Sequence, residues 1–234
     1  MRYGFIKAAA ATPEIRVADC SYNAGPTVKL MRGGSAKGVK LLVFPELCIT
    51  GYTCSDLFLQ RRLLDGALTA LRTVMEASRK LSLLTVAGLP LTVEDKLYNC
   101  AAVIFQGEIL GVVPKTNLPN YNEFYEKRHF VPAPAENTVC RLFGKEVPFG
   151  SKLLFCCDTL SELKVAVEIC EDLWSPIPPS NYHALAGATI IANPSASNEV
   201  IGKDAYRKEL VGGQSGRLVC GYIYASAGEG ESTT

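Results

Sequence analysis

The chain has 234 residues, and its 24 Lys and Arg residues against 23 Asp and Glu residues give a formal net charge of +1. This balance excludes the Lys/Arg excess that marks nucleic-acid binders and proteins held at membrane surfaces by basic residues. Hydrophobic residues make up 48% of the chain and charged residues 20%, which excludes an intrinsically disordered protein. The length is enough for one large α/β domain or two small ones with a full hydrophobic core.

The cysteines and the apolar runs exclude further classes of protein. The nine cysteines include no CxxC pair and there are only two histidines, so a disulfide scaffold and a structural zinc site have little support. No stretch approaches the roughly 18 apolar residues of a membrane span. The N-terminal run MRYGFIKAAAATPEI lacks the hydrophobic segment of a signal peptide and is typical of a first strand. We therefore expect a cytoplasmic protein with free thiols.

The first half of the chain alternates strands and helices. VKLLVFP is a continuous apolar run, as in a strand buried on both faces, and Gln106-Gly107 is typical of a tight hairpin turn. Two glycine-containing pairs, Gly25-Pro26 and Gly33-Gly34, interrupt the first helical pattern. In chain order we expect a strand at Tyr3–Ala10, a helix at Val17–Lys37, a strand at Val39–Pro45, a helix over residues 63–75, and strands at Leu83–Leu89, Asn99–Phe105 and Glu108–Val113.

The second half opens with a polar and aromatic loop over residues 114–138. Gly144 is expected to turn a second hairpin, and the ending GEGESTT is expected to be a polar loop. In chain order we expect strands at Arg141–Phe143, Val147–Phe155 and Leu163–Ile169, a short helix from Asn181, a strand at Thr189–Ala192, a helix at Lys203–Arg217 and a strand at Val219–Ala227. Because there are no repeats and no linker, these elements predict one mixed α/β domain.

Three reactive side chains each come directly after an apolar strand. Glu46 follows LLVFP, Lys115 follows ILGVVP, and Cys170 follows KVAVEI. If these strands share a sheet and a direction, the three side chains converge at one edge, where open α/β sheets place their ligands. Each residue also has an ordinary interpretation: a solvated Glu, a surface Lys and a Cys that fills the core.

Strand alternation argues against the core interpretation of Cys170. Val165, Val167 and Ile169 are expected on one face of their strand, and Cys170 on the other with Lys164, Ala166 and Glu168. A Cys, Glu and Lys set can cleave an amide, because the thiolate attacks the carbonyl carbon and the carboxylate transfers the proton to ammonia. The ammonium then stabilises the oxyanion. A Cys–His pair would need His129 or His183, and neither carries a supporting motif.

Three sequence blocks resemble the signature blocks of the nitrilase, or carbon–nitrogen hydrolase, superfamily: LLVFPELCITGY, GVVPKTNLPNYNEFYEKRHF and VAVEICEDLW. The longer forms ELCITGYTCSDLF, LPNYNEFYEKRHF and CEDLWSP resemble the glutaminase domains of glutamine-dependent NAD+ synthetases. The similarity extends from Tyr3 to Glu231. It implies an αββα sandwich in which Glu46 is the base, Lys115 stabilises the oxyanion and Cys170 is the nucleophile. It also implies that Glu126 is a second carboxylate that orients Lys115.

The same resemblance implies a binding site for glutamine. Glu171 would take the ammonium of the free amino acid, and Lys203 with Ser197 its carboxylate. Lys203 stands where arginine is usual, so a bidentate contact is not expected from it. Aromatic side chains would form the wall against the methylenes, with Tyr52 lining the pocket or the ammonia exit. The full predicted set is Tyr52, Tyr121, Phe124, Glu171, Ser197 and Lys203.

The resemblance also implies partners. Residues 1–234 would form the glutaminase domain, expected to lack its last strands because family members continue beyond the equivalent of GEGESTT. Ammonia would pass to a synthetase domain of the same polypeptide that amidates nicotinate adenine dinucleotide. ATP and Mg belong to that domain, which is absent from this chain; no cofactor or metal is expected here, and no phosphate loop occurs in the sequence. A homo-oligomer is expected, with no nucleic acid or membrane partner. The alternatives are a free-standing amidase for another small amide and a non-catalytic assembly module.

Overall fold

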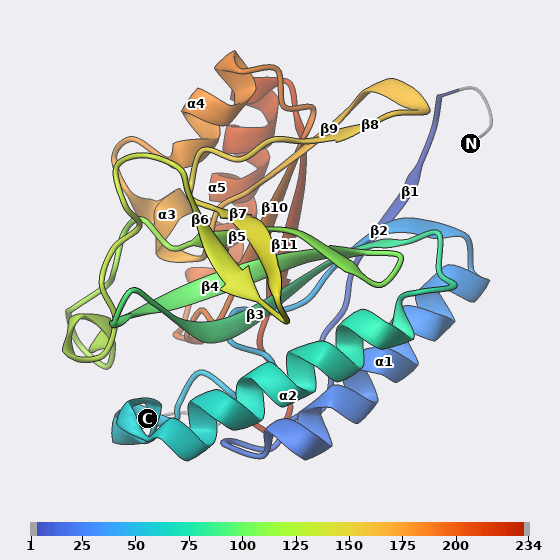
Figure 1. Ribbon diagram of the computed structural model, residues 1–234. Helices are drawn as coiled ribbons and strands as arrows, with labels where there is room; N and C mark the ends of the chain where they lie inside the picture. The colour runs from blue at the N-terminus through green and yellow to red at the C-terminus, as the bar shows by residue number, and fades with distance from the viewer. Residues whose placement is uncertain (1–3, 232–234) are drawn as a thin grey trace.

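The computed structural model describes residues 4–231 and consists of two β-sheets stacked between two layers of helices (Figure 1). The first sheet has seven strands in the order β1-β2-β3-β4-β5-β7-β6, and the second has four in the order β11-β10-β9-β8. The strands of the first sheet are β1 (Lys7–Ala10), β2 (Val39–Val43), β3 (Leu84–Val93), β4 (Lys96–Phe105), β5 (Glu108–Pro114), β6 (Thr138–Leu142) and β7 (Lys145–Phe149). Those of the second are β8 (Phe155–Cys157), β9 (Leu160–Val167), β10 (Ile190–Ser195) and β11 (Gly221–Ser226).

The helices cover the outer faces of the two sheets. Figure 1 shows two long helices side by side below the first sheet, and α4 and α5 beside the second. The α-helices are α1 (Cys20–Ala36), α2 (Arg61–Ala77), α3 (Glu171–Trp174), α4 (Pro179–Leu185) and α5 (Lys203–Leu218), and the 3-10 helices are η1 (Ser55–Leu59) and η2 (Glu126–Arg128). This arrangement is the αββα sandwich predicted from the sequence.

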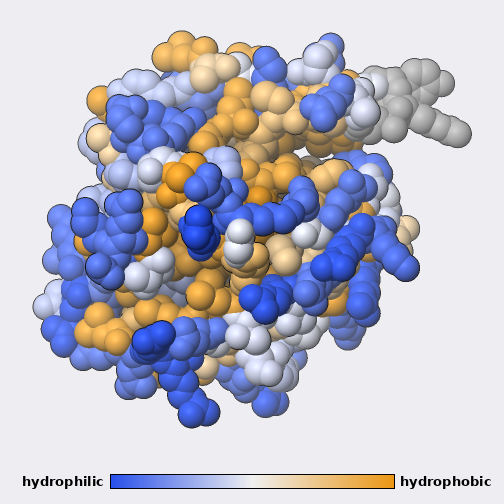
Figure 2. All heavy atoms as spheres, in the orientation of Figure 1, coloured by the Kyte–Doolittle hydropathy of each residue, from blue (hydrophilic) through white to orange (hydrophobic). Residues whose placement is uncertain are grey.

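Strand alternation explains how one short strand serves two apolar layers. In β2, Leu42 packs toward α1 and α2, whereas Leu41 and Val43 pack against the second sheet. The layer between the sheets is completed by residues such as Val165 and Val167 of β9. Where the edges of these layers reach the surface, Figure 2 shows apolar atoms gathered across the middle of the face, between polar regions.

Both predicted hairpin turns are present. Gln106 and Gly107 have φ values of 47° and 83°, and Phe143 and Gly144 have 51° and 80°, as two-residue hairpin turns require. The first helix forms despite Pro26, and the Asp19 side chain accepts a hydrogen bond from the backbone N–H of Tyr22 at 3.0 Å to cap it. Within residues 4–231, no helix is both long and apolar enough to cross a membrane.

The predicted strand Val147–Phe155 is wrong. β7 ends at Phe149, and Phe155 already belongs to β8 of the other sheet, which forms an unpredicted hairpin with β9. The Asn137 side chain explains the break: it donates to the Lys152 carbonyl and accepts from the Lys152 N–H, each at 3.1 Å, and so diverts the chain after Gly150. A Cβ at Gly150 would lie 2.1 Å from Asn137 Oδ1. Tyr3, the predicted start of the first strand, lies outside the described residues.

Candidate active site

Glu46, Lys115 and Cys170 meet where the two sheets face each other. β2 ends three residues before Glu46, and β5 ends directly before Lys115. The two strands run in the same direction, because β2 is parallel to β3 while β4 is antiparallel to both β3 and β5. Cys170 follows β9, which belongs to the second sheet. The convergence therefore does not occur within one sheet but between the strand ends of two stacked sheets.

The turn that carries Glu46 crosses the neighbouring strand at Gly88. A Cβ at this position would lie 2.2 Å from the Leu47 nitrogen and 2.6 Å from the Pro45 oxygen, so only glycine leaves room for the turn. The Glu46 N–H donates to the Ser195 carbonyl of β10 at 3.3 Å. Glu46 is therefore attached to both sheets through its backbone.

Lys115 is clamped between two buried carboxylates. Its Nζ lies 2.6 Å from Glu46 Oε1 and 2.6 Å from Glu126 Oε1, and none of the three residues is more than 3% exposed. Burial by itself would lower the pKa of Lys115, but the Glu126 and Glu46 carboxylates outweigh it and the pKa is raised well above its usual value. Lys115 therefore keeps its positive charge.

Two neutral side chains hold the carboxylates in place. Asn99 of β4 donates from Nδ2 to Glu46 Oε1 at 2.7 Å and to Glu126 Oε2 at 3.3 Å. The Tyr52 hydroxyl donates to Glu126 Oε1 at 2.7 Å. Burial raises the pKa of Glu126, although Lys115 acts in the opposite direction. Sequence reasoning missed Asn99, whose only signal was a polar residue at the start of an apolar strand.

The backbone of Cys170 is in a sparsely populated conformation, with φ 44° and ψ −100°. β9 has already ended at Val167, so strand alternation does not reach Cys170. The predicted face shared with Lys164, Ala166 and Glu168 is therefore wrong. Cys170 packs instead in the apolar layer between the sheets, on the side of Val165.

The pKa of the Cys170 thiol is raised. Burial and, to a smaller extent, the Glu46 carboxylate raise it to about 12, although Lys115 acts in the opposite direction. The hydroxyl of Ser195 and the N–H of Ala196 also face the sulfur and favour its ionised form. The same Ala196 N–H donates to Glu46 Oε2 at 3.0 Å, so the sulfur and the carboxylate share a neighbour. A neighbouring base would be needed to form the thiolate.

Asp172 ties the loop after Lys115 to the turn after Cys170. Its buried carboxylate accepts from the backbone N–H groups of Asn117 at 2.7 Å, Thr116 at 3.1 Å and Ile169 at 2.9 Å. Burial raises its pKa to about 6. Asp172 was also missed, although it lies within the CEDLW block.

The residues predicted to bind glutamine gather around Phe124. The Phe124 ring lies edge-on to Tyr52 and Tyr121, at centroid distances of 6.3 and 5.7 Å. Tyr121 Oη lies 3.0 Å from both carboxylate oxygens of Glu171. Lys203 Nζ lies 5.9 Å from the Phe124 ring centroid and 4.9 Å from that of Trp174, so its charge faces aromatic rings.

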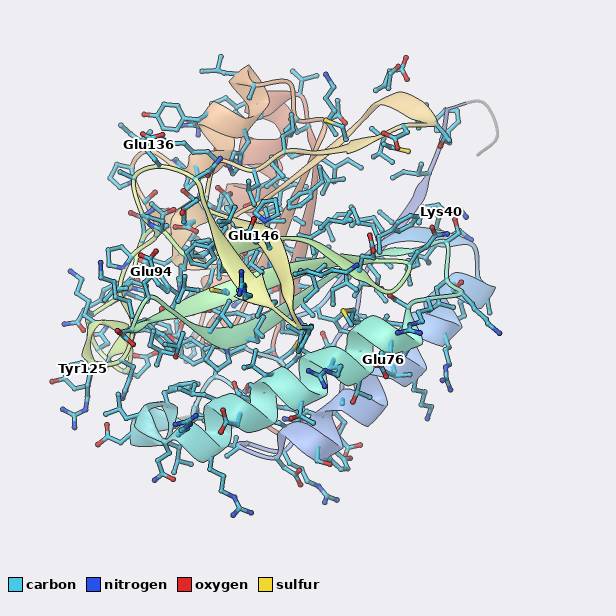
Figure 3. All side chains as sticks on the ribbon, in the orientation of Figure 1. Lys40, Glu76, Glu94, Tyr125, Glu136 and Glu146 are labelled. Carbon is cyan, nitrogen blue, oxygen red and sulfur yellow. The ribbon has the colours of Figure 1, made fainter. Side chains whose placement is uncertain are left out.

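A cavity of about 430 Å³ opens beside these groups. Tyr52, Phe124, Glu126 and Ser197 line it together with Glu231, whereas the other predicted binding residues are not among its described lining residues. Figure 3 shows that the labelled Tyr125 points outward, whereas the next residue, Glu126, is buried.

Glu231 shows that the polar tail is part of this cavity wall. Residues 228–231 of the tail form no helix or strand, as expected, and residues 232–234 lie outside the described part of the chain. Glu231 Oε1 accepts from the Tyr52 N–H at 2.7 Å, and Oε2 lies 3.2 Å from the Thr53 hydroxyl. A Cβ at Gly230 would lie 1.8 Å from the Ile15 oxygen, so the segment is packed closely against the N-terminal loop. Nothing in the polar sequence of the tail indicated this role.

Neither a metal site nor a Cys–His pair is formed by the described part of the chain. No group of three or more His, Cys, Asp or Glu side chains there could hold a metal ion. His129 lies 3.0 Å from Asp56, and His183 lies 2.8 Å from the Ser151 carbonyl. Both histidines are thus engaged by groups outside the Cys170 site.

A sequence model described as carbon–nitrogen hydrolase matches residues 7–210. The chain belongs to the carbon–nitrogen hydrolase family. Among curated proteins, the glutamine-dependent NAD(+) synthetase of Mycobacterium tuberculosis H37Rv is 43% identical over 233 residues, which cover 100% of this chain and 34% of that protein. The corresponding protein of Thermotoga maritima is 36% identical over 194 residues, or 82% of this chain and 30% of that protein. This carbon–nitrogen hydrolase chain thus spans about a third of the length of such relatives.

Solved structures of the family agree with the sandwich. The crystal structure of a glutamine-dependent NAD(+) synthetase from Cytophaga hutchinsonii matches with a TM-score of 0.85 at 30% identity, over 95% of this chain and 36% of that one. An amidase from Nesterenkonia sp. matches with a TM-score of 0.75 at 21% identity, over 98% of this chain and 80% of that one, which shows a common fold. The predicted membership of the nitrilase superfamily is confirmed.

Proposed function

We propose that this carbon–nitrogen hydrolase chain cleaves the side-chain amide of glutamine through a thioester on Cys170. The ammonia would serve the ATP-dependent amidation of nicotinate adenine dinucleotide to NAD+ in a longer enzyme. The observation that carries the proposal is the Lys115 ammonium, buried between the Glu46 and Glu126 carboxylates beside the Cys170 thiol.

The reaction follows from the charges of these groups. Glu46 takes the proton from the Cys170 sulfur, which attacks the amide carbon, and the Lys115 ammonium stabilises the oxyanion. As the intermediate collapses, Glu46 gives the proton to the departing nitrogen, which leaves as ammonia. Water, deprotonated by Glu46, then attacks the thioester, releasing glutamate and restoring the thiol. Glu126 keeps Lys115 in position throughout.

The binding residues suit a free amino acid. Glu171 supplies a negative charge for the substrate ammonium, and Lys203 with Ser197 would take its carboxylate. The rings of Tyr52, Tyr121 and Phe124 would pack against the methylenes. Three of the six, Tyr52, Tyr121 and Lys203, surround the ring of a fourth, Phe124, which supports their assignment to one site.

The remaining assignments rest on the relatives. ATP and Mg would be bound by a synthetase domain in the same polypeptide. A homo-oligomer in the cytoplasm is part of the proposal. The free thiols of all nine cysteines support a reducing compartment.

The test uses Cys170→Ala in the full-length protein. Glutamine-dependent NAD+ formation and glutamate release are expected to be lost, while ammonia-dependent formation persists, because only amide cleavage needs the thiol. Cys156→Ala, which removes an exposed thiol, is the control. An equal loss of ammonia-dependent synthesis would contradict the proposed division of labour. A higher kcat/KM for a short aliphatic amide than for glutamine would favour a general amidase.

A further inference from the structure

Glu168 is a buried acid that the reaction proposed above does not use. It lies two residues before Cys170, is 1% exposed, and forms no ion pair with any Lys, Arg or His of residues 4–231. One carboxylate oxygen accepts from the Ser180 N–H at 2.7 Å, and the other accepts from the Tyr222 hydroxyl. Burying a carboxylate without a cationic partner costs folding free energy, so a role for this residue and its two hydrogen bonds has to be sought.

The contacts of Glu168 continue to the nucleophile. Tyr222 on β11 accepts at its hydroxyl oxygen from Asn193 Nδ2 at 2.9 Å. Asn193 on β10 in turn accepts at Oδ1 from the Cys170 N–H at 2.9 Å, which that N–H shares with the Pro194 carbonyl at 3.0 Å. The chain therefore crosses three adjacent strands, from the carboxylate after β9 to Tyr222, to Asn193 and back to the peptide of Cys170.

The carboxylate sets the direction of every bond in this chain. An ionised carboxylate only accepts, so the Tyr222 hydrogen points toward Glu168 and leaves the hydroxyl oxygen free to accept. Asn193 must then turn its NH₂ group toward Tyr222, which places its oxygen toward Cys170. The opposite orientation of the Asn193 amide would set two donors against each other at the Cys170 N–H.

We propose that Glu168, Tyr222 and Asn193 are positioning residues that hold the peptide of Cys170 in its unusual conformation. The inference rests on the proposed role of Cys170 as nucleophile. It accounts for φ 44° and ψ −100° at a non-glycine residue, which persist only where surrounding contacts fix them. A thiol must lie close to its target carbon and its base, so a small displacement of this peptide slows the attack.

Two substitutions in the full-length protein test the chain. Glu168→Gln replaces an acceptor with a donor, so two donors must meet either at the Ser180 N–H or, through a reversed chain, at the Cys170 N–H. Tyr222→Phe keeps the ring and leaves the Asn193 amide without its partner. Both have matched controls: Glu162→Gln on the exposed part of β9, and Tyr182→Phe on the exposed face of α4. Burial raises the pKa of Glu168 to about 7, so the assays are run at about pH 8, where most of Glu168 is ionised.

Two readouts separate positioning from folding. The first is kcat and KM for glutamine, and the second is the rate at which iodoacetamide alkylates Cys170, followed by peptide mass spectrometry. We expect both test variants to lower kcat and the alkylation rate by about tenfold to a hundredfold, with KM changed less than about twofold, while the controls match the wild type. All measurements are made well below the thermal midpoint of each variant.

Folded variants with wild-type kcat and wild-type alkylation would overturn the inference, even if their thermal midpoints fall. A rise in KM without a change in kcat would also overturn it, because that pattern indicates lost substrate binding. Failure of the proposed function is distinguishable: the wild type would then not hydrolyse glutamine, whereas Cys170 alkylation would still report whether the chain positions the thiol.

Discussion

Replacing Asn99 with leucine removes the only neutral side chain that bridges both carboxylates around Lys115 in the described structure. Leucine has a similar branched shape, so the change removes the amide with little change in packing. The Nδ2 bond to Glu46 at 2.7 Å is charge-assisted and is worth about 1.5–3 kcal/mol. The bond to Glu126 at 3.3 Å is longer and adds less.

If Asn99 orients Glu46 in the transition state, Asn99→Leu is expected to lower kcat/KM for glutamine by roughly 10- to 150-fold. The assay is glutamate release by the full-length protein. Thr85→Val is the matched control, because Thr85 is a buried polar residue on β3 whose hydroxyl has no hydrogen-bond partner in the described part of the chain. Wild-type kcat/KM in a folded Asn99→Leu variant, or an equal loss in Thr85→Val, would refute this reasoning.

Four other changes have definite expected outcomes. Lys115→Arg is expected to lose most glutaminase activity, because the space between the two carboxylates, each 2.6 Å from the Lys115 ammonium, does not fit a planar guanidinium. Wild-type turnover in this variant would place Lys115 outside catalysis. Gly88→Ala is expected to lower the thermal midpoint strongly, because its Cβ would lie 2.2 Å from backbone. Glu231→Gln is expected to lower kcat severalfold, because it weakens the contact that holds the turn carrying Tyr52. Glu229 is exposed, so Glu229→Gln should match the wild type. Burial raises the pKa of Glu168 to about 7, above its value in the unfolded chain. The stabilising contribution of Glu168 is therefore present at low pH and is lost as the pH rises through 7. In urea titrations, the free energy of unfolding of the wild type relative to Glu168→Gln should fall from about pH 5 to about pH 8.

The predicted elements came mainly from patterns that depend on nearest neighbours. Apolar runs and glycine turns located most of the strands and the Gln106-Gly107 hairpin, because burial on both faces and positive φ leave local marks. The hairpin of β8 and β9 left no such mark in the sequence. It depends on Asn137, which binds the backbone of a residue 15 positions further along the chain.

The residues of the candidate site also differ in whether their nearest neighbours in the sequence reveal them. Glu46, Lys115 and Cys170 could be proposed from their positions after apolar strands, and motif resemblance added Glu126. Their supporting contacts could not be found that way, because Asn99 and Asp172 act through partners from distant segments. Strand alternation also failed at Cys170, because β9 ends at Val167 and the backbone of Cys170 is not extended, with φ 44°.

Glu46 has a consequence for how such an enzyme can change over evolution. Its carboxylate contacts Lys115 of the first sheet on one oxygen and the Ala196 N–H after β10 on the other, so it spans the gap between the sheets. The width of that gap is set by apolar residues such as Val43 and Val167, which are buried between the sheets. A change in their volume would alter the distance that the Glu46 carboxylate bridges. We therefore expect residues of the inner layer to vary in compensating pairs, because the geometry around Glu46 constrains their combined volume.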